Sequence, residues 1–175
     1  MAIYLSAGHY EKDSGAVGNG YKENELCIEL RDMVVPRLGG YRVITDKDCE
    51  TLSQYLARIK PGNASVVVEI HFNAATPSAT GTEVLIADNH NTLSRDLADD
   101  LSTEIASTLC IPNRGVKTES QSARGRLAFV RQEGACALIE VCFISNKKDM
   151  ESYQKHKEEV AEAIAELLKE YDDKI

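Results

Sequence analysis

Uniformly apolar runs alternate along this chain with longer stretches in which apolar residues recur every three or four positions. The run at 65–72 is apolar at nearly every position, which is typical of a strand buried on both faces at the centre of a sheet. Runs of this kind predict strands at 2–6, 41–44, 65–72, 82–87, 127–130 and 136–142.

The periodic stretches between these runs predict helices. The first helix is expected to begin near Glu23, to carry Pro36 in its last turn and to end at the glycine pair 39–40. In the stretch 93–109, leucine or isoleucine recurs every four residues, which places these side chains on one face of a second helix.

The last periodic stretch spans about 147 to 171. Asn146 stands where an N-cap is expected, and Asp149 follows in the capping-box position. Alternation of strands and helices is typical of a largely parallel or mixed sheet covered on both faces. The sequence therefore predicts an α/β fold in which residues 1–175 form a single three-layer domain, with a twisted sheet of about six strands and helices on both faces.

Composition narrows the choice of partners. The chain has 175 residues with 43% hydrophobic and 27% charged residues, values of an ordinary globular protein. Its formal net charge of −8 argues against nucleic acid or an anionic membrane surface as the main partner. The five cysteines show no CxxC spacing, and we interpret Cys27, Cys136 and Cys142 as reduced core residues.

The N-terminus shows no basic region followed by a long apolar stretch, and no run approaches transmembrane length. We therefore expect synthesis in the cytoplasm without a signal peptide.

Side chains suited to metal binding and proton transfer stand at or near the ends of three predicted strands: His9, His71 and Glu140. Functional groups of α/β sheets gather at the carboxyl ends of strands, so a pairing that makes these strands neighbours would bring the three groups together. Two histidines and a carboxylate at a helix start can bind a metal, and a buried carboxylate nearby can transfer protons. This combination indicates zinc-assisted hydrolysis.

Each residue also has an ordinary structural interpretation. His9 could be a surface residue of a polar loop, and His71 could be a satisfied core histidine. Glu140 lies in an apolar run, where a charge needs a partner or a proton. Glu69 lies two residues before His71 and hence on the same face, either orienting His71 or forming a structural ion pair.

The segments that carry these residues resemble, in order, the zinc-dependent N-acetylmuramoyl-L-alanine amidases of phage endolysins, spore-cortex enzymes and cell-division hydrolases. The resemblance extends from residue 3 to about 165. The matching segments are Ala7-Gly8-His9 with 13–18 following, then 22–26, Ile70-His71-Phe72-Asn73-Ala74, 81–84, 114–117 and 138–146.

The resemblance implies a role for each matching residue. His9, Glu23 and His71 would be the ligands of one zinc ion, with Glu23 preferred over Glu25, and Glu140 would be the catalytic carboxylate. Asn73 would border the substrate groove. The chain departs from the common pattern at Tyr10 and at Cys142, where a glycine is usual, and we expect both side chains to add bulk near the site.

The implied activity is hydrolysis of the amide between N-acetylmuramic acid and L-alanine in peptidoglycan. We expect a phage-type endolysin that acts on the bacterial wall after release, as a monomer, with no nucleic-acid or membrane partner. Two alternatives stay open at this point. One is a zinc peptidase that cuts the stem peptides, and the other is a non-catalytic wall-binding module or structural α/β protein.

Overall fold

Six strands form one sheet in the computed structural model, which describes residues 1–123 and 125–175. The strand order is β4-β1-β5-β8-β6-β7, and every neighbouring pair is parallel except β6 and β8. The strands are β1 (Ala2–Ala7), β4 (Val43–Thr45), β5 (Ser65–Asn73), β6 (Thr82–Ile86), β7 (Asn113–Thr118) and β8 (Ala135–Phe143). The predicted mixed sheet of about six strands is confirmed, with the run at 65–72 near its centre.

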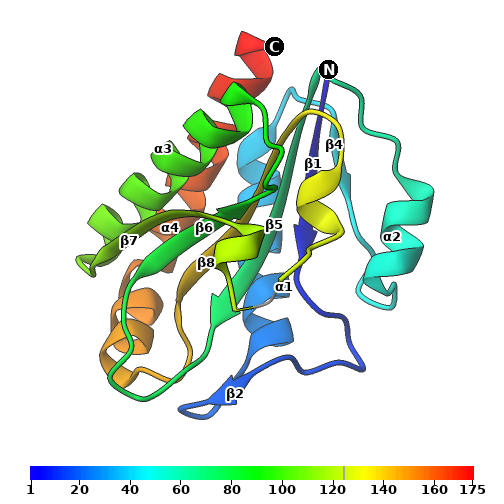
Figure 1. The fold of residues 1–175 in the computed structure, drawn as a ribbon. Helices are drawn as coiled ribbons and strands as arrows, with labels where there is room; N and C mark the ends of the chain where they lie inside the picture. The colour runs from blue at the N-terminus through cyan, green and yellow to red at the C-terminus, as the bar shows by residue number, and fades with distance from the viewer. Residues whose placement is uncertain (124) are drawn as a thin grey trace.

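One face of the sheet is covered by the three long helices, α1 (Glu23–Val34), α3 (Thr92–Leu109) and α4 (Lys147–Lys174). Figure 1 shows α3 and α4 running side by side across this face. The larger apolar core lies between these helices and the sheet, and includes Leu30, Ile70, Leu101 and Ile164. Burial of this apolar area is the main stabilising term of such a domain.

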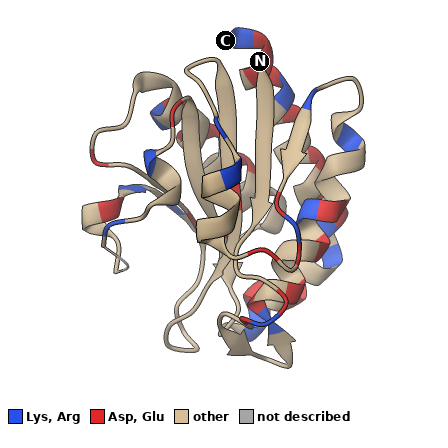
Figure 2. Ribbon diagram, turned by 90° about the vertical axis from the view of Figure 1, so that its right-hand side faces the viewer, with Lys and Arg blue, Asp and Glu red and all other residues tan. Residues whose placement is uncertain are grey.

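The opposite face carries only a thin cover. The short helix α2 (Leu52–Arg58) and the 3-10 turn η3 (Phe129–Arg131) pack there over a smaller core that includes Tyr4, Tyr55, Val67 and Leu138. Helices therefore lie on both faces, as predicted, but very unequally (Figure 1). Charged residues lie mainly on helices and loops, while the long central strands are almost free of them (Figure 2).

The sequence-based strand at 127–130 is wrong. Phe129–Arg131 form η3, and the sixth strand is β7. A short apolar run does not distinguish a strand from another buried segment, and here Phe129 and Val130 fill the smaller core. Strand β7 was not predicted from the sequence. It lies at the edge of the sheet, where its sequence Asn-Arg-Gly-Val-Lys-Thr needs little apolar character.

The long helices begin close to where the sequence predicts, but the α-helix expected to reach the glycine pair 39–40 ends at Val34, and one cap differs. Helix α1 begins at Glu23, and Pro36 lies in the following 3-10 turn η1 (Val35–Leu38). Asn146 caps α4, since its side-chain oxygen accepts the backbone N–H groups of Lys148 and Asp149. The expected capping box is wrong, because the Asp149 carboxylate turns toward the sheet instead.

Smaller elements complete the chain. A hairpin of β2 (Val17–Gly18) and β3 (Tyr21–Lys22) leads into α1, and the 3-10 turn η2 (Glu119–Gln121) follows β7. Cys27, Cys136 and Cys142 are buried free thiols, as expected. No helix in residues 1–123 and 125–175 combines the length and apolarity needed to cross a bilayer.

Candidate metal centre and active site

The three strands that carry the candidate residues are consecutive in the sheet, as the sequence-based hypothesis required. Strand β5 lies between β1 and β8, and in the register of β5 and β8 His71 stands beside Glu140. His9 follows β1 by two residues. The four proposed functional groups thus come from one end of adjacent parallel strands and from the first turn of α1.

Strand alternation places the polar side chains on the thinly covered face. In β5, Val68, Ile70 and Phe72 belong to the core under the long helices, so Glu69 and His71 point to the other side. In β8, Leu138 belongs to the smaller core, and Glu140 follows it on the same face. The site therefore continues the smaller core toward the carboxyl ends of the strands.

His9 is held by carboxylates on both ring nitrogens. Its Nδ1 lies 2.8 Å from Oδ2 of Asp13, and its Nε2 lies 3.0 Å from Oε2 of Glu23. Burial alone would lower the pKa of His9, but the hydrogen bonds to Glu23 and Asp13 outweigh burial and raise it. His9 has a backbone φ of 67°, which turns the chain sharply after β1.

Glu23 joins the two histidines. Besides His9, its carboxylate contacts Nδ1 of His71 at 2.9 Å, and it accepts backbone N–H groups of Ala16 at 2.9 Å and Phe72 at 3.2 Å. Burial would raise the pKa of Glu23, yet these hydrogen bonds to the two histidines hold it far below the usual range. As the first residue of α1, the carboxylate also lies where the helix dipole favours negative charge.

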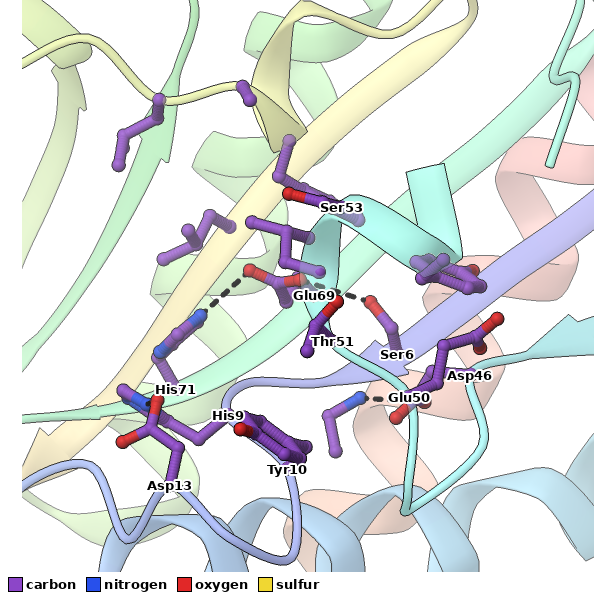
Figure 3. A pocket seen from close by; sticks show the side chains of 17 residues that line it. Ser6, His9, Tyr10, Asp13, Asp46, Glu50, Thr51, Ser53, Glu69 and His71 are labelled. Atoms are coloured by element: carbon purple, nitrogen blue, oxygen red, sulfur yellow. Dashed lines mark hydrogen bonds and ion pairs between the residues drawn. The ribbon is translucent and has the colours of Figure 1, made fainter. Parts of the chain in front are cut away.

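His71 is oriented from its other nitrogen by Glu69. The Nε2 atom of His71 lies 2.8 Å from Oε1 of Glu69, whose second oxygen accepts the Ser6 hydroxyl at 3.3 Å (Figure 3). Burial would lower the pKa of His71, but Glu23 and Glu69 outweigh burial and raise it to about 10. Glu69 thus forms a buried ion pair with His71 and holds its ring from Nε2, so the contact agrees with both interpretations of Glu69.

The donor atoms of His9, Glu23 and His71 lie within 4.8 Å of one another. Nitrogen and carboxylate donors of this kind are zinc ligands, which bind at about 2.0–2.2 Å from the ion. Two glycines leave the room that this cluster needs. A Cβ at Gly15 would lie 2.6 Å from Oε2 of Glu23, and a Cβ at Gly8 would lie 2.3 Å from Cε1 of His71. The residues therefore fit a metal centre.

Glu140 is almost completely buried, with 1% of its surface exposed. It stands between His71 on β5 and Glu83 on β6, its partners in the strand register. Glu83 is neutralised by Arg114 at 3.0 Å and Lys117 at 2.6 Å. The negative charge of Glu83, which lies beside Glu140 in the sheet, is thus offset by two cationic side chains.

Asn73 ends β5 close to the same network. Its amide nitrogen donates to Oε1 of Glu83 at 2.9 Å, and its side-chain oxygen accepts the Ala74 N–H. The structure thus engages both ends of the Asn73 amide in local hydrogen bonds.

A pocket of about 390 Å³ opens beside the two histidines and extends to α2. Figure 3 shows His9, His71 and Asp13 on one side of it and Asp46 and Glu50 on the other. Tyr10 lines this pocket, in agreement with bulk near the site. Cys142 does not add bulk there, because it is fully buried in the core under the long helices.

Several residues that shape the site were not identified from the sequence. Asp13 lies in a polar loop without any local signal. Arg31 and Asp46 form a buried ion pair at 3.0 Å, and the Asp46 carboxylate accepts the Ala7 N–H at 3.0 Å. A buried arginine in the polar half of a helix is indistinguishable from a solvated one until its partner is known. The Thr51–Gln54 capping box could have revealed α2.

Relatives of known sequence share most of this chain. The uncharacterized protein YqiI of Bacillus subtilis (strain 168) is 31% identical over 179 residues, which cover 98% of this chain and 84% of YqiI. The N-acetylmuramoyl-L-alanine amidase LytC of the same strain is 27% identical over 93% of this chain. The match covers only 34% of LytC, so the chain spans about a third of that relative.

A solved structure shares the fold. The N-acetylmuramoyl-L-alanine amidase from Clostridium difficile 630 superposes with a TM-score of 0.81, at 21% identity, over 98% of this chain and 96% of that one. The N-acetylmuramoyl-L-alanine amidase family itself matches residues 3–170. The chain is therefore a member of the N-acetylmuramoyl-L-alanine amidase family of enzymes.

Proposed function

We propose that this chain is a zinc-dependent hydrolase that cleaves the amide between the lactyl group of N-acetylmuramic acid and L-alanine in peptidoglycan. The observation that carries the proposal is the convergence of His9, Glu23 and His71, with donor atoms within 4.8 Å, beside a buried glutamate. Two histidines and one carboxylate are a ligand set of catalytic zinc sites in which a further position stays available. Bound there, a zinc ion would supply Lewis acidity for water and for the amide carbonyl.

The chain's own residues would hold the ligands in place. Asp13 fixes the ring of His9 through Nδ1, and Glu69 fixes the ring of His71 through Nε2. Such contacts set the tautomer of a ligating histidine and prevent rotation of its ring. His9 would accordingly present Nε2 and His71 would present Nδ1 toward the centre.

Glu140 would act as the proton carrier. A carboxylate in this role takes a proton from the attacking water and returns it to the leaving nitrogen of L-alanine. Its position beside His71 in the register of β5 and β8 supports the assignment. Asn73 would border the substrate, with its side chain held by Glu83 as a fixed wall of the groove.

The test compares three glutamate variants for zinc content and for clearing of purified peptidoglycan of several chemotypes. We expect Glu140→Gln to retain about one zinc and to lose nearly all turnover, because only the proton carrier is removed. Glu23→Gln should lose zinc and activity together. Glu25→Gln is the matched control, since Glu25 is an exposed partner of Lys22 in the same helical turn, and it should retain both.

Mass analysis of the products decides which bond is cut. A newly freed amino group on L-alanine supports the amidase assignment, whereas other new termini would replace it with a stem-peptide peptidase. Clearing by Glu140→Gln at the wild-type rate would contradict the role of Glu140. Absence of zinc from the wild type would remove the metal centre itself.

A further inference from the structure

The pocket beside the metal centre combines an apolar wall with a ring of carboxylates. Leu127, Phe129 and Leu138 contribute apolar surface from η3, the residues before it, and β8. Asp13, Asp46, Glu50 and Glu69 contribute carboxylates, and the described residues that line the pocket include no lysine or arginine. Pockets of this volume are large enough for a substrate side chain.

Each of the four carboxylates has a partner, since Asp13 contacts His9 and Glu69 contacts His71, but the group around Asp46 keeps an excess of negative charge. Arg31 pairs with Asp46, but the same guanidinium is shared with Asp32 and Asp48. Arg58 pairs with Glu50 from outside the pocket. Low-dielectric walls strengthen the potential of such a cleft, so a cation is favoured within it.

Tyr55 adds an independent indication that the pocket receives a ligand. The side chain comes from α2, is 1% exposed and lines the pocket. Its hydroxyl has no hydrogen-bond partner among the described residues. A buried hydroxyl without a partner is energetically costly, and a ligand with a hydrogen-bonding group would recover that cost. Burial, with the charges of Asp46 and Glu69, raises the pKa of Tyr55, so the hydroxyl stays neutral.

We propose that this pocket binds an alkylammonium group, namely the side chain of the diamino residue of the peptidoglycan stem peptide. An alkylammonium has an aliphatic stem that matches the apolar wall and a charged head that matches the carboxylates and the Tyr55 oxygen. The pocket is continuous with the proposed metal centre, because His9 and His71 belong to both. This inference rests on the proposed function, since it assigns a specificity site to the same reaction.

The test uses two soluble N-acetylmuramoyl tripeptides that differ only at the third residue, L-lysine in one and L-norleucine in the other. For the zinc-loaded wild type we expect kcat/KM to be about tenfold higher with the lysine compound, the discrimination that about 1.4 kcal/mol provides. Tyr55→Phe and Glu50→Gln should each lower kcat/KM for the lysine compound severalfold and leave the norleucine compound unchanged. Tyr41→Phe is the control, because the Tyr41 hydroxyl bonds Asp173, away from the pocket.

Equal kcat/KM for the two compounds in the wild type would overturn the proposal. Equal losses on both compounds in Tyr55→Phe and Glu50→Gln would also overturn it, because such losses would mean general damage to the site. If neither compound is cleaved, the proposed function fails, and calorimetric affinities then decide about the pocket. Tenfold tighter binding of the lysine compound supports the ammonium site, whereas equal affinities reject it.

Discussion

A single carboxylate organises the proposed metal centre. Glu23 contacts His9, His71 and the backbone N–H groups of Ala16 and Phe72, so the loop after β1 and strand β5 meet at one side chain of α1. The close approach of the loop at Gly15 makes this arrangement possible, because Gly15 has φ +61 and no Cβ. Gly15, which has no functional side chain, therefore determines whether the donor atoms can come close together.

Gly15→Ala tests this dependence. The new Cβ would lie 2.6 Å from both Oε2 of Glu23 and Nε2 of His9, so we expect loss of zinc binding in a competition assay with a chelator. Left-handed backbone costs an alanine about 1–2 kcal/mol. The control is Gly40→Ala, with φ +93 and open space around the Cβ, which should lose similar stability and retain zinc. Unchanged affinity in Gly15→Ala would contradict the steric argument.

At this scale the sequence predicts the donors but not the residues that support them. His9, His71 and Glu140 each have an ordinary interpretation alone, but together they stand at or near the ends of three predicted strands, where functional groups of α/β sheets gather. Asp13 and Asp46 lie in polar loops, where an aspartate is common, so their contacts became visible only with the fold. The alternation of Glu69 and His71 on one strand face was predictable, since the period of a strand is two residues.

The first turn of α4 controls the position of the neighbouring strands. Asp149 is 1% exposed, and its carboxylate accepts N–H groups of Gly81 at 3.1 Å and Phe143 at 3.0 Å. These contacts tie the helix to the start of β6 and the end of β8. Glu83 on β6 and Glu140 on β8 lie opposite each other in the strand register. The first turn of α4 therefore holds the two strands that carry these site residues.

Asp149→Ala should therefore destabilise the protein strongly. It leaves two buried N–H groups without their acceptor, and we expect the free energy of unfolding to fall by roughly 3 kcal/mol. Urea titration of the metal-free protein measures this change. Glu151→Ala, an exposed position in the same helical turn, should change stability by less than about 0.5 kcal/mol. Similar small losses in both variants would show that Asp149 is replaceable.

Elements with strong periodicity were predictable, and those determined by tertiary contacts were not. Helices α1, α3 and α4 follow from their apolar stripes. The run at 127–130 was mistaken for a strand because its apolar side chains fill the smaller core from a 3-10 turn. Strand β7 is recognised only beside its neighbour β6, since four of its six residues are polar or charged.

At the scale of the whole molecule, acidic groups held by cations determine how stability depends on pH. Burial would raise the pKa of Glu83, but the hydrogen bonds to Lys117 and Arg114 outweigh burial and lower it. The pKa of Glu119 is lowered against the effect of burial by the Leu127 N–H and by Arg131. A carboxyl group with a lowered folded-state pKa stabilises the fold above its unfolded pKa, and this contribution is lost as pH falls.

We therefore expect the free energy of unfolding of the metal-free protein to decrease as pH falls below 4.5, the ordinary pKa of a glutamate. Urea titrations between pH 7 and pH 3 measure the decrease. In Glu83→Gln the stability at pH 7 should be lower and the decrease smaller. Glu166→Gln, at an exposed position of α4, is the matched control. An unchanged pH dependence in Glu83→Gln would refute the contribution of Glu83.

The extent of the domain, the monomeric state and the phage origin stay predictions. Membership of the amidase family gives the reaction class.

The two edges of the sheet have a consequence for behaviour at high concentration. Strand β4 has only three residues, and β7 begins with a register shift opposite Thr82 and Glu83. Arg114 and Lys117 place charges along that edge. Short, irregular and charged edges discourage strand addition from a second molecule. Neither edge of the sheet therefore offers a template for aggregation. This property favours a protein that stays dispersed while it acts on an insoluble polymer.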